Sequence, residues 1–440
     1  MAHFLMAYNQ YPDISELYSL YQKYSVITID SRKTSSDSIF FALKGDNFNG
    51  NQFAESALNG GCCYAIIDEE KFCKGDKYIL VKNVLSSLQD LAKYHRKQLN
   101  IPILCITGSN GKTTTKDLIQ CVLSKKYNIL ATTGNLNNHI GVPLTLLSIK
   151  KNIQVAIIEI GANHIGEISS LCEMAQPDYG LITNIGKAHL GEFGGFENVI
   201  KAKSELYQYL KKNKKKIFLN SGNPLLISLS EGIDKINYDT ISTCSLQEAS
   251  PFLKIQFDDQ IIFSQLIGTY NLENIASAIC VGKYFCVENE KIKQAIEKYI
   301  PSNNRSQILK KGNNTIVLDI YNANPVSMRV AIENFSTMNG ENKILILGDM
   351  LELGNYSANE HQEILKLIMN NNFERVILVG KNFMNAASEI KFSVREKFFF
   401  NTSDELVHDI QNIPSLQNKS SFILIKGSRG IKLEKVMEYL

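Results

Sequence analysis

The segment from Gly108 to Thr114 has the composition of a phosphate-binding loop. It reads Gly-Ser-Asn-Gly-Lys-Thr-Thr and directly follows an apolar run at 101–107. Backbone N–H groups at the start of a helix attract anions, and glycines let the backbone approach phosphates closely. In such a loop Lys112 reaches the β- and γ-phosphates and the hydroxyl of Thr113 ligates Mg²⁺. The segment therefore predicts a nucleotide site, without separating ATP from GTP.

The match to the general phosphate loop is incomplete. The motif G-x-x-x-x-G-K-[ST] requires glycine at position 106, where this sequence has Ile106. The run Gly-Lys-Thr by itself also arises by chance. The strand, loop and helix around it are what favour a nucleotide site.

Two more residues that could do chemistry follow apolar runs. Glu159 lies near the end of the run 154–160, where a carboxylate is unfavourable unless it is paired or bound to a metal. We predict that it ligates Mg²⁺, the alternative being a carboxylate that caps a neighbouring loop. His189 follows the run 180–183, and ligands bind where parallel strands end. A structural histidine is the alternative there.

The elements that must position these residues fall into three predicted domains, 1–98, 99–300 and 301–440. In the first domain, Ser86 is a possible N-cap of a helix at 86–98, and strands are expected at 25–29, 38–43, 63–67 and 77–81. In the second, strands are expected at 101–107, 154–160, 180–183 and 216–220, and helices at 197–212 and 271–285. In the third, strands are expected at 315–319, 343–347, 375–379, 397–400 and 422–425.

Alternation of strands and helices predicts an α/β protein with mainly parallel sheets. Pro301, followed by Ser302 and Asn303, is a predicted hinge between the second and third domains.

The composition excludes several classes of protein. The chain has 440 residues, 44% of them hydrophobic, and 47 Lys and Arg against 44 Asp and Glu. A net charge of +3 gives no reason to expect nucleic acid or a membrane surface as a partner. The N-terminus lacks the pattern of a secretory signal, and no apolar run is long enough to span a membrane. Nine scattered cysteines without a C-x-x-C pair indicate reduced, buried thiols in a cytoplasmic protein.

The segment from Ile106 to Thr115 resembles the shortened phosphate loop of the Mur ligases, the ATP-dependent amide-forming enzymes of peptidoglycan precursor synthesis. That family lacks the first glycine of the general motif, which accounts for Ile106. Further similar segments follow in the family's order at 30–33, 41–45, 159–168, 321–325 and 348–354. The first two are similar to the family's amino-terminal substrate domain, and the last three are similar to segments typical of the member that joins D-alanyl-D-alanine to UDP-N-acetylmuramoyl-tripeptide.

The resemblance implies a fold and a reaction. The fold is a small α/β substrate domain, a central phosphate-loop domain with a mainly parallel sheet, and a Rossmann-like C-terminal domain. ATP phosphorylates the carboxylate that ends the tripeptide, the amine of D-alanyl-D-alanine attacks the acyl phosphate, and phosphate leaves.

The resemblance also implies roles for residues of the central domain. The loop holds the phosphates, Thr113 and Glu159 ligate one Mg²⁺, and His189 ligates a second. Lys203 falls where the family carries a lysine carbamylated by CO₂ or bicarbonate, which would also help bind Mg²⁺, and Lys201 is the alternative by a register error. Lys112, Lys203, His189 and Glu159 are thus the expected catalytic residues. The loop residues expected to contact ATP are Gly108, Ser109, Asn110, Gly111, Lys112, Thr113 and Thr114.

Other roles implied by the resemblance lie outside the loop. Asn271 and Asn274 fall in a segment similar to the family's adenine-contacting segment, with helix capping as the alternative. Arg305 corresponds to an arginine that reaches the γ-phosphate, and Asp319 to the residue that contacts the ribose. Many relatives have two adjacent acids where this chain has Leu318 before Asp319. In the first domain the expected substrate contacts are Ser31 and Arg32, although both could merely shape a turn.

Two alternatives to this function stay open on the sequence. One is a sibling ligase, either another peptidoglycan member or folylpolyglutamate synthase. The other is a non-catalytic nucleotide-binding protein. We expect a monomer in the cytoplasm.

Overall fold

The computed structural model describes residues 11–301, 304–413, 416 and 420–440. Residues 1–10 belong to the N-terminal segment in which no secretory signal is predicted, and they lie outside the described residues. Ser302 and Asn303 of the predicted hinge also lie outside them. Contacts divide the chain into two units, which are described in turn. Unit 1 comprises 1–106, 127–161 and 166–180, and unit 2 comprises 107–126, 162–165 and 181–440.

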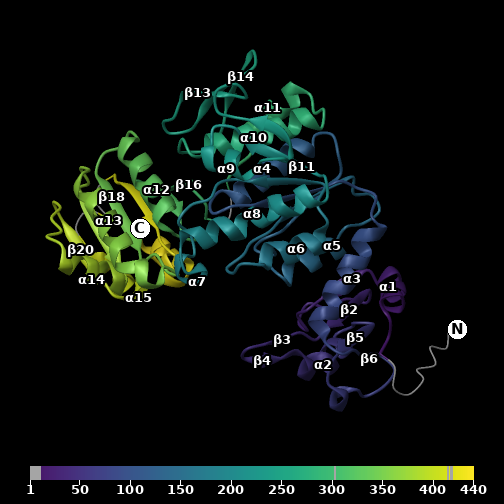
Figure 1. Cartoon of the computed structure of the whole chain (residues 1–440). Helices are drawn as coiled ribbons and strands as arrows, with labels where there is room; N and C mark the ends of the chain where they lie inside the picture. Colours follow the sequence, from purple (N-terminus) through teal and green to yellow (C-terminus); the bar gives the residue numbers. More distant parts are fainter. Residues whose placement is uncertain (1–10, 302–303, 414–415, 417–419) are drawn as a thin grey trace. The chain divides into compact units, whose positions relative to one another are not determined.

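Unit 1 begins with a parallel four-stranded sheet in the order β1-β2-β5-β6 (Figure 1). Its strands lie where the alternation of apolar runs and turns predicts them, and its core packs Phe40, Ala65 and Ile67 between the sheet and α2. The elements are α1 (Ile14–Lys23), β1 (Val26–Thr28), β2 (Ser38–Phe41), β3 (Lys44–Gly45), β4 (Phe48–Asn49), α2 (Ala54–Asn59), β5 (Tyr64–Ile67), β6 (Tyr78–Leu80) and α3 (Val84–Gln98).

The start of α3 differs from the prediction. The N-cap is Asn83, whose side-chain oxygen accepts a hydrogen bond from the backbone N–H of Ser86 at 2.8 Å. Ser86 is therefore the third residue of the helix rather than its cap. Asparagine is as good an N-cap as serine, and the earlier start adds the buried Val84 to the helix.

His95, in the last turn of α3, makes the stability of unit 1 depend on pH. The residue is 7% exposed, and its ring nitrogens lie 3.1 Å from the carbonyl oxygen of Ile149 and 3.2 Å from the hydroxyl of Tyr18. Burial lowers the pKa of the imidazole from its usual 6.5. The unfolded chain therefore binds a proton in mild acid that the folded chain does not, so this contribution to stability is present above pH 6.5 and is lost as the pH falls.

We expect the urea midpoint of unfolding to fall between neutral pH and pH about 5, and to fall less in a His95→Gln variant. Circular dichroism during urea titration measures it. His408→Gln is the control, because that side chain is 88% exposed. Equal pH slopes for wild type and His95→Gln would contradict the assignment.

The rest of unit 1 carries the buried strands that lead to the phosphate loop. β7 pairs in parallel with β9, with Ile106 opposite Glu159, and every residue of both strands is buried. The six-stranded sheet has the order β12-β11-β10-β7-β9-β8. The elements are β7 (Ile103–Thr107), β8 (Ile129–Ala131), α5 (Gly141–Leu147), β9 (Val155–Glu159), α6 (Glu167–Ala175) and β10 (Tyr179–Ile182).

Unit 2 supplies the helices that follow these strands. α4 and α10 pack against each other. A small antiparallel sheet, β13-β14-β15, was not predicted, because its short strands mix polar and apolar residues without a clean alternation. The elements are α4 (Lys112–Leu123), α7 (Leu190–Phe193), α8 (Phe196–Lys212), β11 (Lys216–Asn220), α9 (Pro224–Leu229), β12 (Asp234–Tyr238), β13 (Ser245–Glu248), β14 (Lys254–Phe257), β15 (Gln260–Phe263), α10 (Asn271–Tyr284) and α11 (Asn289–Lys298).

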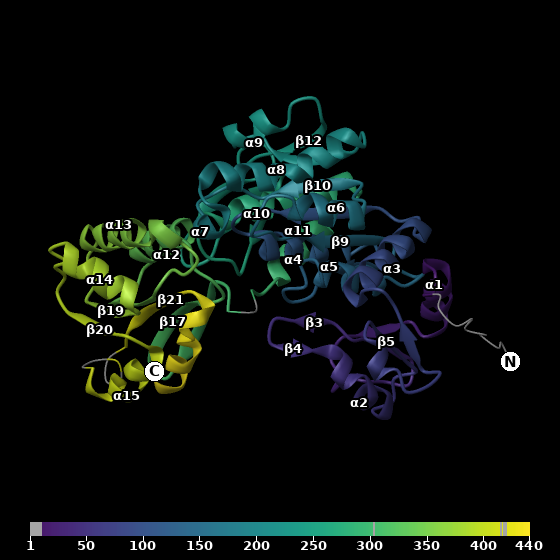
Figure 2. The ribbon, with the colours of Figure 1, turned by 60° about the horizontal axis from the view of Figure 1, so that its bottom comes forward.

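The C-terminal part of unit 2 is a second six-stranded sheet in the order β16-β17-β21-β18-β19-β20 (Figure 2). All its pairings are parallel except β16 with β17. The backbones of Gly348 and Gly427 pack directly against each other, and a Cβ on Gly427 would lie 2.9 Å from Cα of Gly348. The elements are β16 (Gln307–Lys311), β17 (Asn314–Asp319), α12 (Pro325–Thr337), β18 (Lys343–Gly348), α13 (Ser357–Met369), β19 (Arg375–Val379), α14 (Lys381–Glu389), β20 (Lys397–Phe400), α15 (Ser403–Asp409) and β21 (Phe422–Lys426).

All nine cysteines are free thiols, but they are not uniformly buried as predicted. Cys73 and Cys286 are exposed, and Cys63 and Cys121 are half-buried. The remaining ones are buried: Cys62, Cys105, Cys172, Cys244 and Cys280. Burial raises the pKa of the Cys244 and Cys280 thiols to about 12, so both are unreactive. Among the helices of the described residues, none is both long and apolar enough to cross a bilayer.

Candidate active site

The predicted phosphate loop joins β7 to α4 as the sequence indicates. Gly111 is the residue before the helix and has a φ of +79°, which favours glycine. Gly108 has a φ of +146°, and a Cβ there would lie 2.0 Å from the hydroxyl oxygen of Thr183. Lys112 is the first residue of α4, and its ammonium donates hydrogen bonds to the carbonyls of Gly108 at 2.6 Å and Ser109 at 3.2 Å. The lysine therefore lies over the loop that it is predicted to serve.

A second loop, which follows β10, holds the phosphate loop in shape. The Thr183 hydroxyl donates to the carbonyl of Asn110 at 2.6 Å, and the side chain of Asn184 accepts from the Asn110 backbone N–H at 3.0 Å. The Ser109 hydroxyl donates to the Gly186 carbonyl at 3.0 Å and accepts from its N–H at 2.9 Å. The sequence analysis assigned no role to Thr183 or Asn184. Their position as polar residues directly after a buried strand is the signal that could have found them.

Asn271 and Asn274, the predicted adenine contacts, lie buried at the start of α10. Asn274 accepts a hydrogen bond from the Thr115 hydroxyl at 3.0 Å and donates to Asn271 at 2.8 Å. Asn271 in turn donates to the carbonyl of Ile267 at 2.8 Å. A Cβ on Gly111 would lie 2.7 Å from the Asn274 side-chain oxygen. The pair thus joins α10 to α4 at the phosphate loop. Helix capping by Asn271, the alternative, is wrong, because residue 270 is the N-cap.

Glu159, in unit 1, is the last residue of β9 and is 2% exposed. Its carboxylate accepts a hydrogen bond from the side chain of Asn137 at 2.9 Å, and its backbone N–H donates to the Thr132 hydroxyl at 2.9 Å. Burial of a carboxylate to this depth costs free energy unless the carboxylate accepts hydrogen bonds or binds a cation.

His189, in unit 2, meets two carboxylates. Its Nδ1 lies 2.8 Å from Oε2 of Glu352 and 3.4 Å from Oε2 of Glu192. Both His189 and Glu352 have left-handed backbones, with φ of +52° and +65°, and for such residues this conformation is unfavourable unless the surroundings enforce it. The backbone N–H of Gly191 donates to the Glu352 carbonyl at 3.0 Å, which holds the two loops together. An imidazole and two carboxylates form a donor set that suits a divalent cation.

Glu352 belongs to the segment 348–354, and another acid of this segment, Asp349, anchors the loop that carries Glu352. Asp349 is 4% exposed, and its carboxylate accepts from the backbone N–H groups of Asn382 and Phe383 at 2.9 Å each. Burial raises the pKa of this carboxyl. The buried ring of His361 accepts from the Met350 N–H at 3.1 Å. Asp349 thus anchors the segment, and Glu352 is the acid that it presents.

The two candidate lysines on α8 have different surroundings. Lys201 is exposed, whereas Lys203 is 2% exposed. The Lys203 ammonium donates to the carbonyl of Ala162 at 3.4 Å and lies 5.6 Å from the centre of the Phe193 ring. Lysine is rarely buried to this extent outside functional sites and ion pairs. Of the two, Lys203 therefore has the buried position, and its carbamylation stays a prediction.

In the C-terminal part, Asp319 ends β17, and Arg305 lies before β16. The Arg305 guanidinium stacks on the Tyr321 ring with 3.5 Å between its central carbon and the ring centre. This stacking holds the arginine at the loop that begins with Asp319. Arg429 lies farther from the same ring, at 5.9 Å.

Ser31 and Arg32, the predicted substrate contacts of unit 1, lie in an exposed turn. The Arg32 side chain is 86% exposed, and its guanidinium donates two hydrogen bonds to the Asp30 carboxylate at 2.8 and 2.9 Å. These bonds lower the pKa of Asp30 to about 2. The contacts of Arg32 shape the turn, which is the alternative that the sequence left open. A contact between Arg32 and the substrate stays a prediction.

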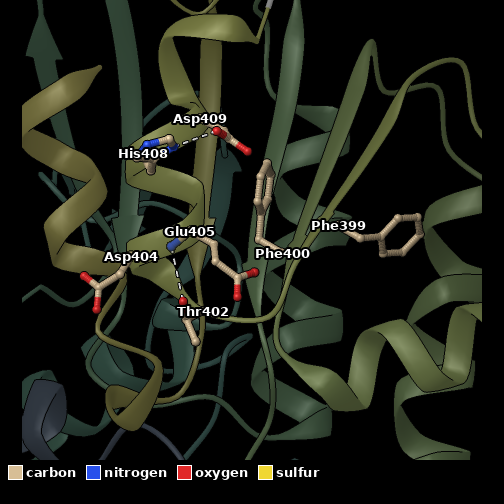
Figure 3. A pocket seen from close by; sticks show the side chains of 7 residues that line it. All are labelled: Phe399, Phe400, Thr402, Asp404, Glu405, His408 and Asp409. Atoms are coloured by element: carbon tan, nitrogen blue, oxygen red, sulfur yellow. Dashed lines mark hydrogen bonds and ion pairs between the residues drawn. The ribbon is translucent and has the colours of Figure 1, made fainter.

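A shallow depression of about 560 Å³ lies elsewhere, between β20 and α15 (Figure 3). Its lining includes Phe399, Phe400, Glu405 and His408, and none of the predicted site residues is among the lining residues. Within it, Nδ1 of His408 lies 2.9 Å from Oδ1 of Asp409, a contact that Figure 3 draws as a dashed line. It contributes nothing to the candidate site.

The chain is similar to known proteins along most of its length. The model of the Mur ligase family catalytic domain matches residues 23–104, that of the Mur ligase middle domain 106–282, and that of the Mur ligase glutamate ligase domain 304–429. The chain is 33% identical to the UDP-N-acetylmuramoyl-tripeptide–D-alanyl-D-alanine ligase of Bacillus subtilis, over 94% of this chain and 92% of that protein. It is also 33% identical to the ligase of the same name from Haemophilus influenzae, over 93% and 92%.

The fold has the same relatives. A crystal structure of MurF from Acinetobacter baumannii superposes with a TM-score of 0.85 at 28% identity, covering 97% of this chain and 98% of that one. The predicted α/β class with mainly parallel sheets is confirmed, as is the resemblance drawn from the motifs. On these grounds the chain belongs to the Mur ligase family.

Proposed function

We propose that this chain joins D-alanyl-D-alanine to UDP-N-acetylmuramoyl-tripeptide, with ATP as the source of energy, in peptidoglycan precursor synthesis. The observation that carries the proposal is its match, over more than nine-tenths of both lengths, to ligases named for this reaction. The phosphate loop supports the ATP-dependent part, because Lys112 and the N-terminus of α4 form a ready anion site.

The reaction needs activation, since a carboxylate is a poor electrophile. Transfer of the γ-phosphoryl group to the tripeptide carboxylate gives an acyl phosphate, and attack by the D-alanyl-D-alanine amine forms the amide and releases phosphate. Lys112 and the loop amides stabilise charge on the transferring group, and the braced loop positions it.

The residues present fit a divalent cation. The carboxylate of Glu159, the hydroxyl of Thr113 and the imidazole of His189 would hold Mg²⁺, at two sites in all, and Mg²⁺ would neutralise phosphate charge. Addition of CO₂ to the neutral amine of Lys203 would replace a buried cation with an anion that helps to bind the metal.

Further contacts complete the proposed site. In this proposal Asn271 and Asn274 contact adenine, Asp319 contacts the ribose, and Arg305 contacts the γ-phosphate. Ser31 and Arg32 serve the UDP-substrate.

The proposal also includes an organisation and a setting. The domains are 1–98, 99–300 and 301–440, which the three separate family matches support. The protein works as a monomer in the cytoplasm, the compartment in which free thiols persist.

Phosphate release tests the function. ATP, Mg²⁺ and bicarbonate are supplied, and UDP-N-acetylmuramoyl-tripeptide and D-alanyl-D-alanine are each added or omitted. Two tripeptides are tested, one ending in diaminopimelate and one ending in lysine. We expect phosphate release with one of them, and only when D-alanyl-D-alanine is also present. ATP binding without release in any combination would contradict the proposal. Turnover with a folate substrate and glutamate would then identify a sibling ligase, and its absence a non-catalytic nucleotide-binding protein.

A further inference from the structure

Lys426 is a buried cation that the sequence analysis did not single out. It is the last residue of β21 and is 1% exposed. In the parallel sheet it lies opposite Asp319 of β17 on one side and Leu347 of β18 on the other. Lysine is almost never buried to this extent without a partner, so the contacts of its ammonium indicate its role.

The Lys426 ammonium contacts the residues that end β17. It donates a hydrogen bond to Oδ2 of Asp319 at 2.6 Å and a longer one to the carbonyl of Asn322 at 3.4 Å. It therefore bonds both the carboxylate and the backbone three residues further along. A charge-assisted hydrogen bond of this length fixes the rotation of a carboxylate.

The other oxygen of Asp319 is left for a ligand. The Asp319 side chain is 17% exposed at the carboxyl edge of a parallel sheet, where ligands bind. Within the described ranges, Oδ1 of Asp319 has no hydrogen bond from the protein. Lys426 thus occupies Oδ2 and leaves Oδ1 as the acceptor that a ligand can use.

The backbone around Lys426 is itself fixed. The Ser428 hydroxyl donates to the Ala323 carbonyl at 3.3 Å and accepts from the Leu351 N–H at 2.9 Å. Gly427 packs directly on Gly348, where a side chain would clash. The segment 426–428 therefore holds the loops after β17 and β18 at once.

We propose that Lys426 is a positioning residue, which orients the Asp319 carboxylate so that Oδ1 accepts a hydrogen bond from a ribose hydroxyl of the nucleotide. The inference rests on the proposed contact of Asp319 with ATP. Without the lysine, the Asp319 carboxylate is free to rotate, and an Oδ1 that no longer points at the ribose hydroxyl is a poorer acceptor.

The test is the preference for ATP over 2′-deoxyATP and 3′-deoxyATP in equilibrium competition binding by the full chain. A purely structural ion pair would change all three affinities alike, whereas a positioning residue changes their ratio. We expect the wild type to prefer ATP over at least one deoxy analogue by roughly tenfold or more, the range for a hydrogen bond to a charged group. Lys426→Met should lose most of that preference.

Three further variants complete the test. Asp319→Asn should lose the same preference, and the double variant should lose no more than either single one, because both substitutions act on one hydrogen bond. Lys435→Met is the matched control, since Lys435 bonds Asp404 at the same 2.6 Å but is 42% exposed. Should Lys426→Met not fold, Lys426→Gln, which is neutral and of similar length, is measured instead with the same expected loss.

Several results would overturn the inference. The first is a wild-type preference retained by the Lys426 variant but lost by Asp319→Asn. The second is a wild type without any preference. The third is an Asp319→Asn variant with the wild-type preference, which would also remove the ribose contact. Phosphate release that still requires both substrates would show in each case that the ligase function itself stands.

Discussion

The Lys203→Ala variant is expected to lose turnover by on the order of a hundred- to a thousandfold, the loss typical of removing one preorganised electrostatic group. It should still bind ATP, because the phosphate loop does not depend on this side chain. The position is buried, so an anionic carbamate there would attract a bound cation more strongly than it would in water. Phosphate release measures turnover, and equilibrium binding of ATP measures affinity.

Lys201 provides the matched control for this variant. It lies two residues away on the same helix but is exposed, so Lys201→Ala should turn over as the wild type does. Full activity in Lys203→Ala would refute the carbamate assignment. Loss of activity in Lys201→Ala alone would show that the register of the assignment is wrong by two residues.

The Lys112→Met variant is expected to lose both ATP affinity and turnover, with kcat/KM lower by on the order of a hundredfold or more. Methionine keeps the aliphatic chain but removes the ammonium that lies over the carbonyls of Gly108 and Ser109. Isothermal titration with ATP and initial rates of phosphate release measure the two effects.

Lys125 serves as the control for Lys112, because it follows the other end of the same helix. Lys125→Met should bind ATP with wild-type affinity. A Lys112→Met protein that is folded by circular dichroism and binds ATP normally would remove the phosphate loop from the mechanism.

Most strands of the two large sheets could be predicted because their chemistry is local, whereas β8, β12 and β16, which lie at or near sheet edges, were not predicted. Buried parallel strands are short apolar runs rich in β-branched residues, and runs such as 101–107 and 375–379 correspond to β7 and β19. The phosphate loop was predictable for the same reason, since its glycines, lysine and threonine are contiguous.

Two features were not predicted because their sequence patterns are ambiguous: the start of α3 and the sheet β13-β14-β15. Asn83 and Ser86 are both good N-caps, and only the packing of Val84 decides between them. The strands β13 to β15 carry exposed residues such as Phe263 on one face, so their pattern resembles neither a buried strand nor a helix.

The contacts of the candidate site were the least predictable, because they join residues far apart in the chain. Glu352 meets His189 across 163 positions of sequence, and Lys426 meets Asp319 across 107. Neither pair has a local signature, since an isolated glutamate or lysine normally lies in solvent. The sheet register that brings strand ends together is what creates them.

The uneven burial of the thiols makes the unmodified chain suitable for spectroscopic labelling. Cys73 lies in unit 1 and Cys286 in unit 2, and these two are the exposed ones among the nine. A maleimide dye pair added under brief, mild conditions should therefore attach first at one position in each unit, because burial raises the pKa of the half-buried Cys63 and Cys121 thiols and slows their reaction, and the remaining thiols are buried. Energy transfer between the dyes would then report, molecule by molecule, whether nucleotide changes the separation of the two units.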